Sequence, residues 1–396
     1  MFSTIFFKSF QTQLKICNFF CINPFHLRDK KLHVIRIPWW RVYFYRVQLL
    51  LVTLYTVGTL KWILFEKDEF LVKAQTVGII GVYTGLEIMI WNWNVNEGPI
   101  QFWNSAVLLE ERILAETSPP EVQTVQDKIS VKFVKYLVYT LNFMTTPSFP
   151  LLNMGLVLNN WCQRPYFGSM TPLCNAEGVW LGSHGVNYLW TAVLGMEMWL
   201  NVVFVYGGGF YLFNLYFPGI ACFLEYIDLL WNSASPNAVT SSHIRNRITQ
   251  YRRIHILEKM FNSYIGNTCI PYMMGILPAI QIFAVYGCIQ FYPVVEMPQY
   301  LIFPLMAVDA FLCNATSATL SSFINMESEH FLTKCKNLNS RKLVGTKTGM
   351  ISREVKACSA LKIRFGSNYI DSGTPLMIQH FCWVQTLQML MIMSKW

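Results

Sequence analysis

Charged residues are scarce in this 396-residue sequence, and the motifs of common enzyme classes are absent from it. Only 13% of the residues are charged and 53% are hydrophobic, which excludes a single soluble domain because one core could not bury so much apolar surface. The sequence has no G-x-S-x-G, H-E-x-x-H or phosphate-binding loop, no Cys-x-x-Cys pair and no internal repeat, and its seven histidines are scattered. We therefore expect no enzyme and no cofactor.

Seven apolar segments are each long enough to cross a bilayer as a helix, which takes about 20 residues. Of the 31 Lys and Arg residues, 26 fall in the N-terminal segment and in every second connection. Because basic residues stay on the cytoplasmic side, we predict an all-α integral protein of the plasma membrane with its N-terminus cytoplasmic and its C-terminus extracellular. The expected spans are 44–64, 73–94, 133–158, 186–215, 268–292, 298–323 and 370–393.

We expect one membrane domain over 1–396, with cytoplasmic parts at 1–43, 240–267 and 324–366. The formal charge of +9 indicates contact with the anionic inner face of the bilayer and no nucleic-acid partner. In the second part, apolar residues recur at three- and four-residue steps between Ile244 and Phe261, which predicts an amphipathic helix. Such a helix lies on the membrane or packs against helices at 323–335 and 353–365, and we favour packing.

Two cysteines, Cys162 and Cys174, fall in the longest expected outer connection, 160–185. They face the oxidising side of the membrane, where disulfides form. Whether these two are bonded stays open, because sequence separation does not fix the distance between Cβ atoms.

Three carboxylates stand near the middles of expected spans, with no Lys or Arg at similar depth. A buried carboxylate is costly unless it is hydrogen-bonded, protonated or in contact with water, so each either holds helices together or serves a site. Aromatic residues around them could line a mostly apolar pocket for a small organic ligand. Pro147 and Gly207 to Gly209 are expected to bend the helices there. The carboxylates are Glu87, Glu197 and Asp309, and the candidate ligand-binding residues are Tyr83, Glu87, Tyr139, Tyr188, Trp190, Glu197, Trp199 and Tyr286.

The last expected span follows a break at 367–375. Thr374 is a suitable N-cap and Pro375 a suitable first-turn residue. Gln379, Cys382, Thr386 and Met393 then share one helix face. This polar stripe predicts either a pore lined by the same helix from several subunits or hydrogen bonds between helices.

The layout resembles that of the insect odorant and gustatory receptor superfamily: seven spans, a cytoplasmic N-terminus, a long basic third inner loop and a divided final span. The resemblance is strongest from Val355 onward, in Ala357 to Gly366 leading into the last helix. Thr386 matches the Thr of the gustatory final-span signature, while Leu387 replaces its Tyr. The superfamily is expected to form ligand-gated, non-selective cation channels for odorants or tastants, with four subunits around a pore lined by the final helix. The implied partners are a small organic ligand and either identical subunits or a co-receptor subunit.

Two other classes of protein have a comparable number of spans. A proton- or ion-coupled transporter would use Glu87, Glu197 and Asp309, although transporters commonly show internal repeats. A G-protein-coupled receptor requires a cytoplasmic C-terminus, which the distribution of Lys and Arg opposes.

Overall fold

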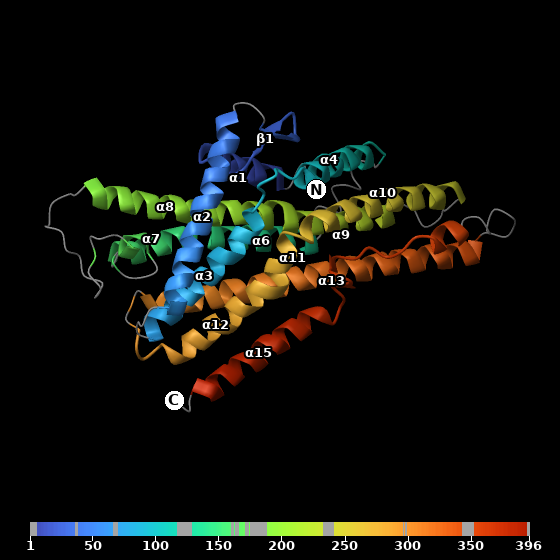
Figure 1. The fold of residues 1–396 in the computed structure, drawn as a ribbon. Helices are drawn as coiled ribbons and strands as arrows, with labels where there is room; N and C mark the ends of the chain where they lie inside the picture. Colours follow the sequence, from blue (N-terminus) through green and yellow to red (C-terminus); the bar gives the residue numbers. More distant parts are fainter. Residues whose placement is uncertain are drawn as a thin grey trace.

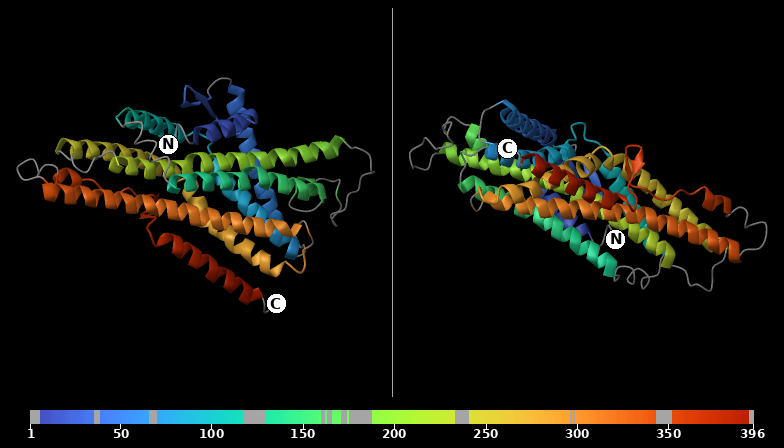
Figure 2. Two further views of the ribbon diagram at one scale, coloured as in Figure 1. Left: turned by 180° about the vertical axis from the view of Figure 1, so that it is seen from behind. Right: turned by 90° about the horizontal axis from the view of Figure 1, so that it is seen from below.

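A computed structural model describes residues 6–35, 39–65, 70–116, 129–159, 162, 166–170, 174, 188–232, 241–295, 297, 299–342 and 352–393. Long helices dominate the described part. In Figure 1, α8, α9, α10 and α13 run along its long dimension, α2 crosses α8, and α15 descends beside α12 and α13. Figure 2 shows the same arrangement from behind and from below.

The N-terminal part contains a helix and a hairpin that the sequence did not predict. Helix α1 spans Phe7–Phe19, and strands β1 (Phe25–Arg28) and β2 (Lys31–Val34) pair antiparallel. Asp29 and Lys30 connect the strands and both have positive φ, as a two-residue type I′ turn requires. The Asn104 side chain accepts a hydrogen bond from the Leu32 N–H (2.8 Å) and donates one to the Leu32 carbonyl oxygen (3.0 Å). Asn104 thereby fixes the hairpin on α4 (Gly98–Glu116).

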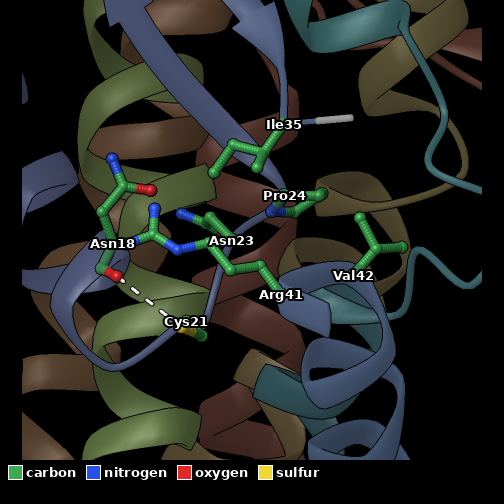
Figure 3. Close-up of a pocket in the computed structure, with 7 residues that line it drawn as sticks. All are labelled: Asn18, Cys21, Asn23, Pro24, Ile35, Arg41 and Val42. Atoms are coloured by element: carbon green, nitrogen blue, oxygen red, sulfur yellow. Dashed lines mark hydrogen bonds between the residues drawn. The ribbon is translucent and has the colours of Figure 1, made fainter. Parts of the chain in front are cut away.

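Figure 3 shows where this N-terminal part meets α2 (Trp39–Phe65). Arg41 of α2 extends between Asn18, Cys21 and Asn23. The side chains close the gap so fully that about 0 Å³ is left for a water molecule. This contact packs the segments on either side of the hairpin against the start of α2 and leaves no room for a ligand.

Helices longer than the bilayer core form the centre of the structure. Helix α3 spans Phe70–Ile90; α6 (Ile129–Phe143) continues into α7 (Phe149–Asn159), and α8 (Tyr188–Gly209) continues into α9 (Phe217–Asn232). The joins are π-helical: Met144–Ser148 contains Pro147, and Phe210–Tyr216 follows the three consecutive glycines. The bends predicted from Pro147 and the glycines therefore coincide with π-helical turns, each of which holds an extra residue relative to an α-helical turn.

Among the described residues, the later α-helices include α10 (Ser241–Ile265), α11 (Cys269–Pro271), α12 (Leu277–Gln290), α13 (Ile302–Lys342) and α15 (Thr374–Met393), and a π-helical segment, Tyr272–Ile276, joins α11 to α12. Helix α13 has 41 residues, about 62 Å at 1.5 Å per residue, so it extends well beyond a bilayer core. The expected span 298–323 and the expected inner helix 323–335 are thus one helix.

Among the described residues, four continuous helical segments are long and apolar enough to cross a membrane. They are Trp39–Phe65, Trp190–Leu230, Cys269–Gln290 and Gln299–Asn337. The apolar part of α3, Thr76–Ile90, is shorter. Seven spans and the orientation of the termini stay predictions.

The amphipathic helix expected at 242–264 is present as α10, and its apolar stripe is buried, with Ile254 and Phe261 at 0% exposure. Phe261 packs between Phe102 of α4 and Phe223 of α9, at ring-centroid distances of 4.9 and 5.4 Å. Tyr251 stacks on Phe331 of α13 at 5.2 Å. The stripe packs against helices, as we favoured, but α4 and α9 were not among the expected partners.

The prediction of a helix at 353–365 is wrong. Only residues 352–356 are helical; 358–363 have no regular structure, and β3 (Arg364–Phe365) and β4 (Asn368–Tyr369) form a second hairpin. Gly366 in its turn has φ of +58°, a conformation that favours glycine. The buried side chains of Leu361 and Ile363 explain the extended path, because alternate residues of an extended chain face the same side.

Candidate functional site

A buried polar cluster joins α2, α3, α7 and α8. The Tyr83 hydroxyl donates to Asn201 Oδ1, and Asn153 Nδ2 donates to the Tyr83 oxygen (2.8 Å) and to Asn201 Oδ1 (2.6 Å). Tyr83, Asn153 and Asn201 are each 1% exposed. Asn201 Nδ2 donates in turn to the backbone carbonyl oxygen of Glu197, 2.9 Å away.

Glu197 forms one end of this cluster. Its Oε1 accepts a hydrogen bond from the Tyr55 hydroxyl (3.4 Å), and its Oε2 accepts one from the Phe167 backbone N–H (2.7 Å). Phe167 lies in a short turn between Cys162 and Cys174, which form a disulfide with Cα atoms 5.6 Å apart. The turn at Phe167–Met170, which lies between the two cysteines, therefore contacts the cluster through the hydrogen bond from Phe167 to Glu197.

One acceptor of the cluster is unused. Within the described part of the chain, Asn153 Oδ1 is buried and has no hydrogen-bond donor. An unsatisfied buried polar atom is unfavourable by about 1–3 kcal/mol, and such atoms in native proteins call for a water or ligand partner. The stacked rings of Tyr83 and Phe204, with centroids 4.3 Å apart, give the cluster an apolar wall.

A small cavity lies about one helical turn inward of the cluster. Leu86 of α3, Phe149 of α7 and Val205 of α8 line it, each three or four residues from a cluster member on the same helix. Its far side carries Asp309 of α13, whose two carboxylate oxygens lie 3.0 and 3.2 Å from the Thr145 hydroxyl. The volume is about 30 Å³, which is room for a water molecule and far below the roughly 300 Å³ of small-ligand pockets.

The eight predicted ligand-binding residues do not all meet. Tyr83 and Glu197 belong to the cluster. Glu87 lies apart, accepting a hydrogen bond from Thr53 of α2 at 2.6 Å. The other five lie elsewhere: Tyr139 beside Lys135, Tyr188 exposed at the start of α8, Trp190 half-buried, Trp199 facing Phe44 and Tyr286 packed on Phe291.

Tyr55, Asn153 and Asn201 were missed from sequence. Asn153 and Asn201 are uncharged polar residues in apolar helices, and the argument that selected Glu197 would have selected them. The three carboxylates have separate partners: Thr53 for Glu87, Tyr55 and Phe167 for Glu197, and Thr145 for Asp309.

The polar stripe of the last helix faces the chain's own helices. Gln281 of α12 donates to Gln379 Oε1 (2.8 Å) and accepts from Asn314 Nδ2 of α13 (2.7 Å). Cys382 and Thr386 are each 2% exposed. The side chain of Met393 lies outside the described residues, and a pore-lining role for the stripe stays a prediction. The exposed face of α15 consists of large apolar residues: Leu376, Met377, Phe381, Trp383, Leu387, Met391 and Ile392.

Asp371 caps α15, in place of the predicted Thr374. Its Oδ1 accepts hydrogen bonds from the N–H groups of Gly373 (3.1 Å) and Thr374 (3.0 Å) and from the Thr374 hydroxyl (2.8 Å). The Asp371 N–H donates to Thr374 Oγ1 at 3.1 Å. These reciprocal bonds form a capping box at the start of α15.

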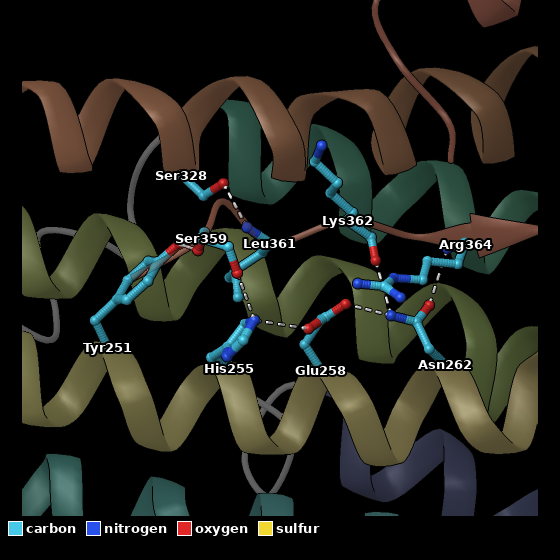
Figure 4. A network of polar contacts seen from close by, with 9 residues as sticks. All are labelled: Tyr251, His255, Glu258, Asn262, Ser328, Ser359, Leu361, Lys362 and Arg364. Atoms are coloured by element: carbon cyan, nitrogen blue, oxygen red, sulfur yellow. Dashed lines mark hydrogen bonds and ion pairs between the residues drawn. The ribbon is translucent and has the colours of Figure 1, made fainter. Parts of the chain in front are cut away.

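The segment before this cap is held between α10 and α13, as Figure 4 shows. Tyr251 donates to the Ser359 carbonyl oxygen (2.8 Å), and the Leu361 N–H donates to Ser328 Oγ (2.9 Å). The side-chain amide of Asn262 binds the backbone of the next residues. Its Nδ2 donates to the Lys362 carbonyl oxygen (2.7 Å), and its Oδ1 accepts from the Arg364 N–H (3.0 Å). We call residues 359–364 with these contacts the latch.

Two titratable groups of α10 lie in the latch. His255 Nε2 is 3.1 Å from Ser359 Oγ and 3.7 Å from Glu258 Oε2, and Glu258 Oε1 accepts a hydrogen bond from Asn262. Burial lowers the pKa of His255, and Lys259 and Arg364 lower it further. Burial raises the pKa of Glu258 to about 7, although Arg364 and Lys259 oppose the change. The latch therefore contains a carboxyl that titrates near neutral pH.

Together these features define a helical membrane protein with a buried polar cluster among its apolar helices and a C-terminal helix that follows the latch and packs against α12 and α13. No protein-family model and no curated protein match the sequence. The structure is similar to two structures of the insect olfactory receptor OR5 from Machilis hrabei, one of them in complex with eugenol. Each match has a TM-score of 0.66 and 10% sequence identity over 97% of this chain and 98% of the other. The chain thus has the fold of an insect olfactory receptor, which confirms the predicted resemblance at the level of the fold.

Proposed function

We propose that this chain is a subunit of a chemosensory receptor that acts as a ligand-gated, non-selective cation channel for small organic odorants or tastants. The observation that carries the proposal is the match to OR5 over 97% of the chain. A match across the whole length supports a shared mode of action more strongly than a shared segment would, although function still resides in particular sites.

The ligand would bind at the cluster of Tyr83, Asn153 and Asn201 and extend into the adjoining cavity. Asn153 Oδ1 offers the unused acceptor, Tyr83 and Phe204 offer an aromatic wall, and Leu86 and Phe149 offer apolar contacts. Because the cavity holds only about 30 Å³, the ligand must separate the helices to enter. It would then favour the expanded conformation by its difference in affinity for the two states.

The pore would form where four copies of α15 meet, in a homotetramer or with a co-receptor subunit. The exposed apolar face of α15 supports this, since so large an apolar surface on one helix requires lipid or a partner. Gln379, Cys382 and Thr386 face the chain's own helices. Exposing them to the pore would therefore require α15 to turn, and the latch connects that movement to α10 and α13.

Whole-cell current in cells expressing the chain, alone and with an odorant co-receptor, tests this function against volatiles, sugars and bitter compounds. We expect ligand-evoked cation current in one of the two conditions. Tyr83→Phe removes the hydroxyl that holds the Asn153 amide in place (2.8 Å), so Asn153 Oδ1 should meet the ligand less well. We expect the half-maximal ligand concentration to rise by up to about tenfold, the effect of roughly one buried hydrogen bond, while the matched change Tyr188→Phe at an exposed position should not raise it. Surface-expressed protein that gives no current in either condition would contradict the proposal.

A further inference from the structure

Helix α2 carries an apolar stripe that points away from the rest of the described chain. Its members recur at steps of three, four and seven residues, which places them on one face of the helix. Each is between 46% and 76% exposed: Trp39, Tyr43, Leu50, Leu54 and Val57. Because α2 is one of the candidate membrane spans, this face would contact lipid in a bilayer.

One positively charged residue, Arg46, stands in this stripe between Tyr43 and Leu50. The 27 residues of α2 make a helix about 40 Å long, close to the roughly 40–45 Å of a bilayer with its headgroups. Arg46 lies about 10 Å from the start of this helix, below the headgroup region. A charged side chain at such a depth is costly unless it reaches the interface.

The Arg46 side chain does reach toward the interface. Helix α3 runs antiparallel to α2 and ends beside its start, because Thr53 bonds Glu87 whereas Tyr45 bonds the Ile90 carbonyl oxygen. Trp93 follows the end of α3 and so lies further toward the start of α2. Arg46 Nε donates to the Trp93 carbonyl oxygen (3.3 Å), and Arg46 Cζ lies 5.4 Å from the centroid of the Trp93 ring.

The two terminal nitrogens of Arg46, Nη1 and Nη2, have no partner within the described part of the chain. Beside them, the rings of Trp91 and Trp93 stack with centroids 6.4 Å apart and are 45% and 36% exposed. A planar guanidinium with open terminal nitrogens can bind two phosphate oxygens at once, and tryptophan rings favour the membrane interface. The arrangement thus offers a phosphate position with an aromatic wall, next to an apolar stripe.

We propose that Arg46 binds the phosphate of an anionic phospholipid of the surrounding membrane. The rings of Trp91 and Trp93 lie beside the glycerol, and an acyl chain runs along Leu50 and Leu54, a contact that free inorganic phosphate could not make. On the predicted orientation the start of α2 is cytoplasmic, and the cytoplasmic leaflet contains anionic lipid. A zwitterionic lipid carries its own cation, which weakens the attraction to Arg46. The site does not depend on the proposed channel activity.

The test is photo-crosslinking of the purified full-length protein in phosphatidylcholine liposomes that contain a trace of a photoreactive lipid. The probe is phosphatidylglycerol or phosphatidylcholine, each with the same diazirine next to the glycerol ester, and labelling of residues 91–93 is measured by peptide mass spectrometry. We expect the phosphatidylglycerol probe to label these residues about fivefold more, as for one basic residue near anionic lipid. Equal labelling by the two probes would overturn the proposal, and this comparison does not depend on any variant folding.

Variants of Arg46 check the location. Arg46→Gln should lower labelling by the phosphatidylglycerol probe to the level of the phosphatidylcholine probe, and Arg46→Lys, which keeps the charge without the planar fork, should give an intermediate value. The matched control Arg353→Gln removes the same charge at an exposed position outside α2 and should leave the labelling unchanged. Unchanged labelling of Arg46→Gln, with the variant eluting as folded protein in size-exclusion chromatography, would overturn the assignment to Arg46.

Discussion

Glu258 of α10 allows a sharp test of the latch. Its side chain is 3% exposed, and burial raises its pKa from 4.5 to about 7. In the unfolded chain the carboxyl ionises near pH 4.5, whereas in the folded chain it stays protonated until about pH 7. The folded state therefore binds more protons between these values, and its stability falls as the pH rises through them.

Glu258→Gln removes this titration and keeps an oxygen acceptor for Asn262. Each pH unit between the two pKa values is worth about 1.4 kcal/mol, which sets an upper limit of roughly 3 kcal/mol above pH 7. Because the neighbouring His255 side chain is 23% exposed, solvent screening reduces this limit, and we expect a gain of about 1–3 kcal/mol at pH 8. At pH 4.5 and below, the variant and the unaltered protein should be equally stable.

The assay is thermal unfolding in detergent, followed by tryptophan fluorescence at pH 4.5 and pH 8. Glu329→Gln, at an exposed position of α13, is the control and should change neither value. A Glu258→Gln variant that is less stable than the unaltered protein at pH 8, or that shows the same pH dependence, would refute the reasoning.

Three further predictions concern other contacts. Asp371→Ala removes the cap of α15 and should weaken hydrogen-exchange protection of its first turn by about fivefold, or about 1 kcal/mol. Unchanged exchange protection of that turn in Asp371→Ala would contradict the cap. Replacing both Cys162 and Cys174 with Ser, which opens a loop with a separation of 12 residues, should lower the free energy of unfolding by about 3 kcal/mol; the same melting temperature with and without reductant would show that the loop does not need the bond. Gly287→Ala places a methyl group against the Phe303 ring and should destabilise the protein by about 1–3 kcal/mol, whereas Gly275→Ala, which meets nothing within 4 Å, should not; equal melting temperatures would argue against this packing.

The sequence predicted what depends on hydrophobic periodicity. The helical class, the buried stripe of α10 and the start of α15 after a break all follow from residue spacing. Helix α4 was missed because its residues were taken as part of the connection between two expected spans. In the structure, Phe102 of α4 packs against Phe261 of α10 with ring centroids 4.9 Å apart. The first hairpin was missed because Asp29 and Lys30 give a weaker turn signal than Asn-Gly or Asp-Gly.

Two residues of the buried polar cluster, Tyr83 and Glu197, were among the candidates chosen from the sequence, and a ligand-binding role for them stays a prediction. Composition marks Glu197 as exceptional in an apolar helix, but not that Asn153 and Asn201 meet Tyr83, because such contacts depend on how four helices pack. The polar stripe of α15 was located correctly on one face. Which neighbour it meets depends on the rotation of α15 against Gln281, which periodicity does not fix.

The central claim, that this chain forms a ligand-gated channel, is tested most directly by cation flux into liposomes containing the purified protein, alone and with an odorant co-receptor. An activating ligand from the current screen is applied with and without an inward proton gradient. We predict ligand-evoked cation flux of equal size in both conditions, retained in Glu197→Gln at a shifted ligand concentration. Ligand uptake that requires the proton gradient and disappears in Glu197→Gln would contradict the channel and identify a proton-coupled transporter.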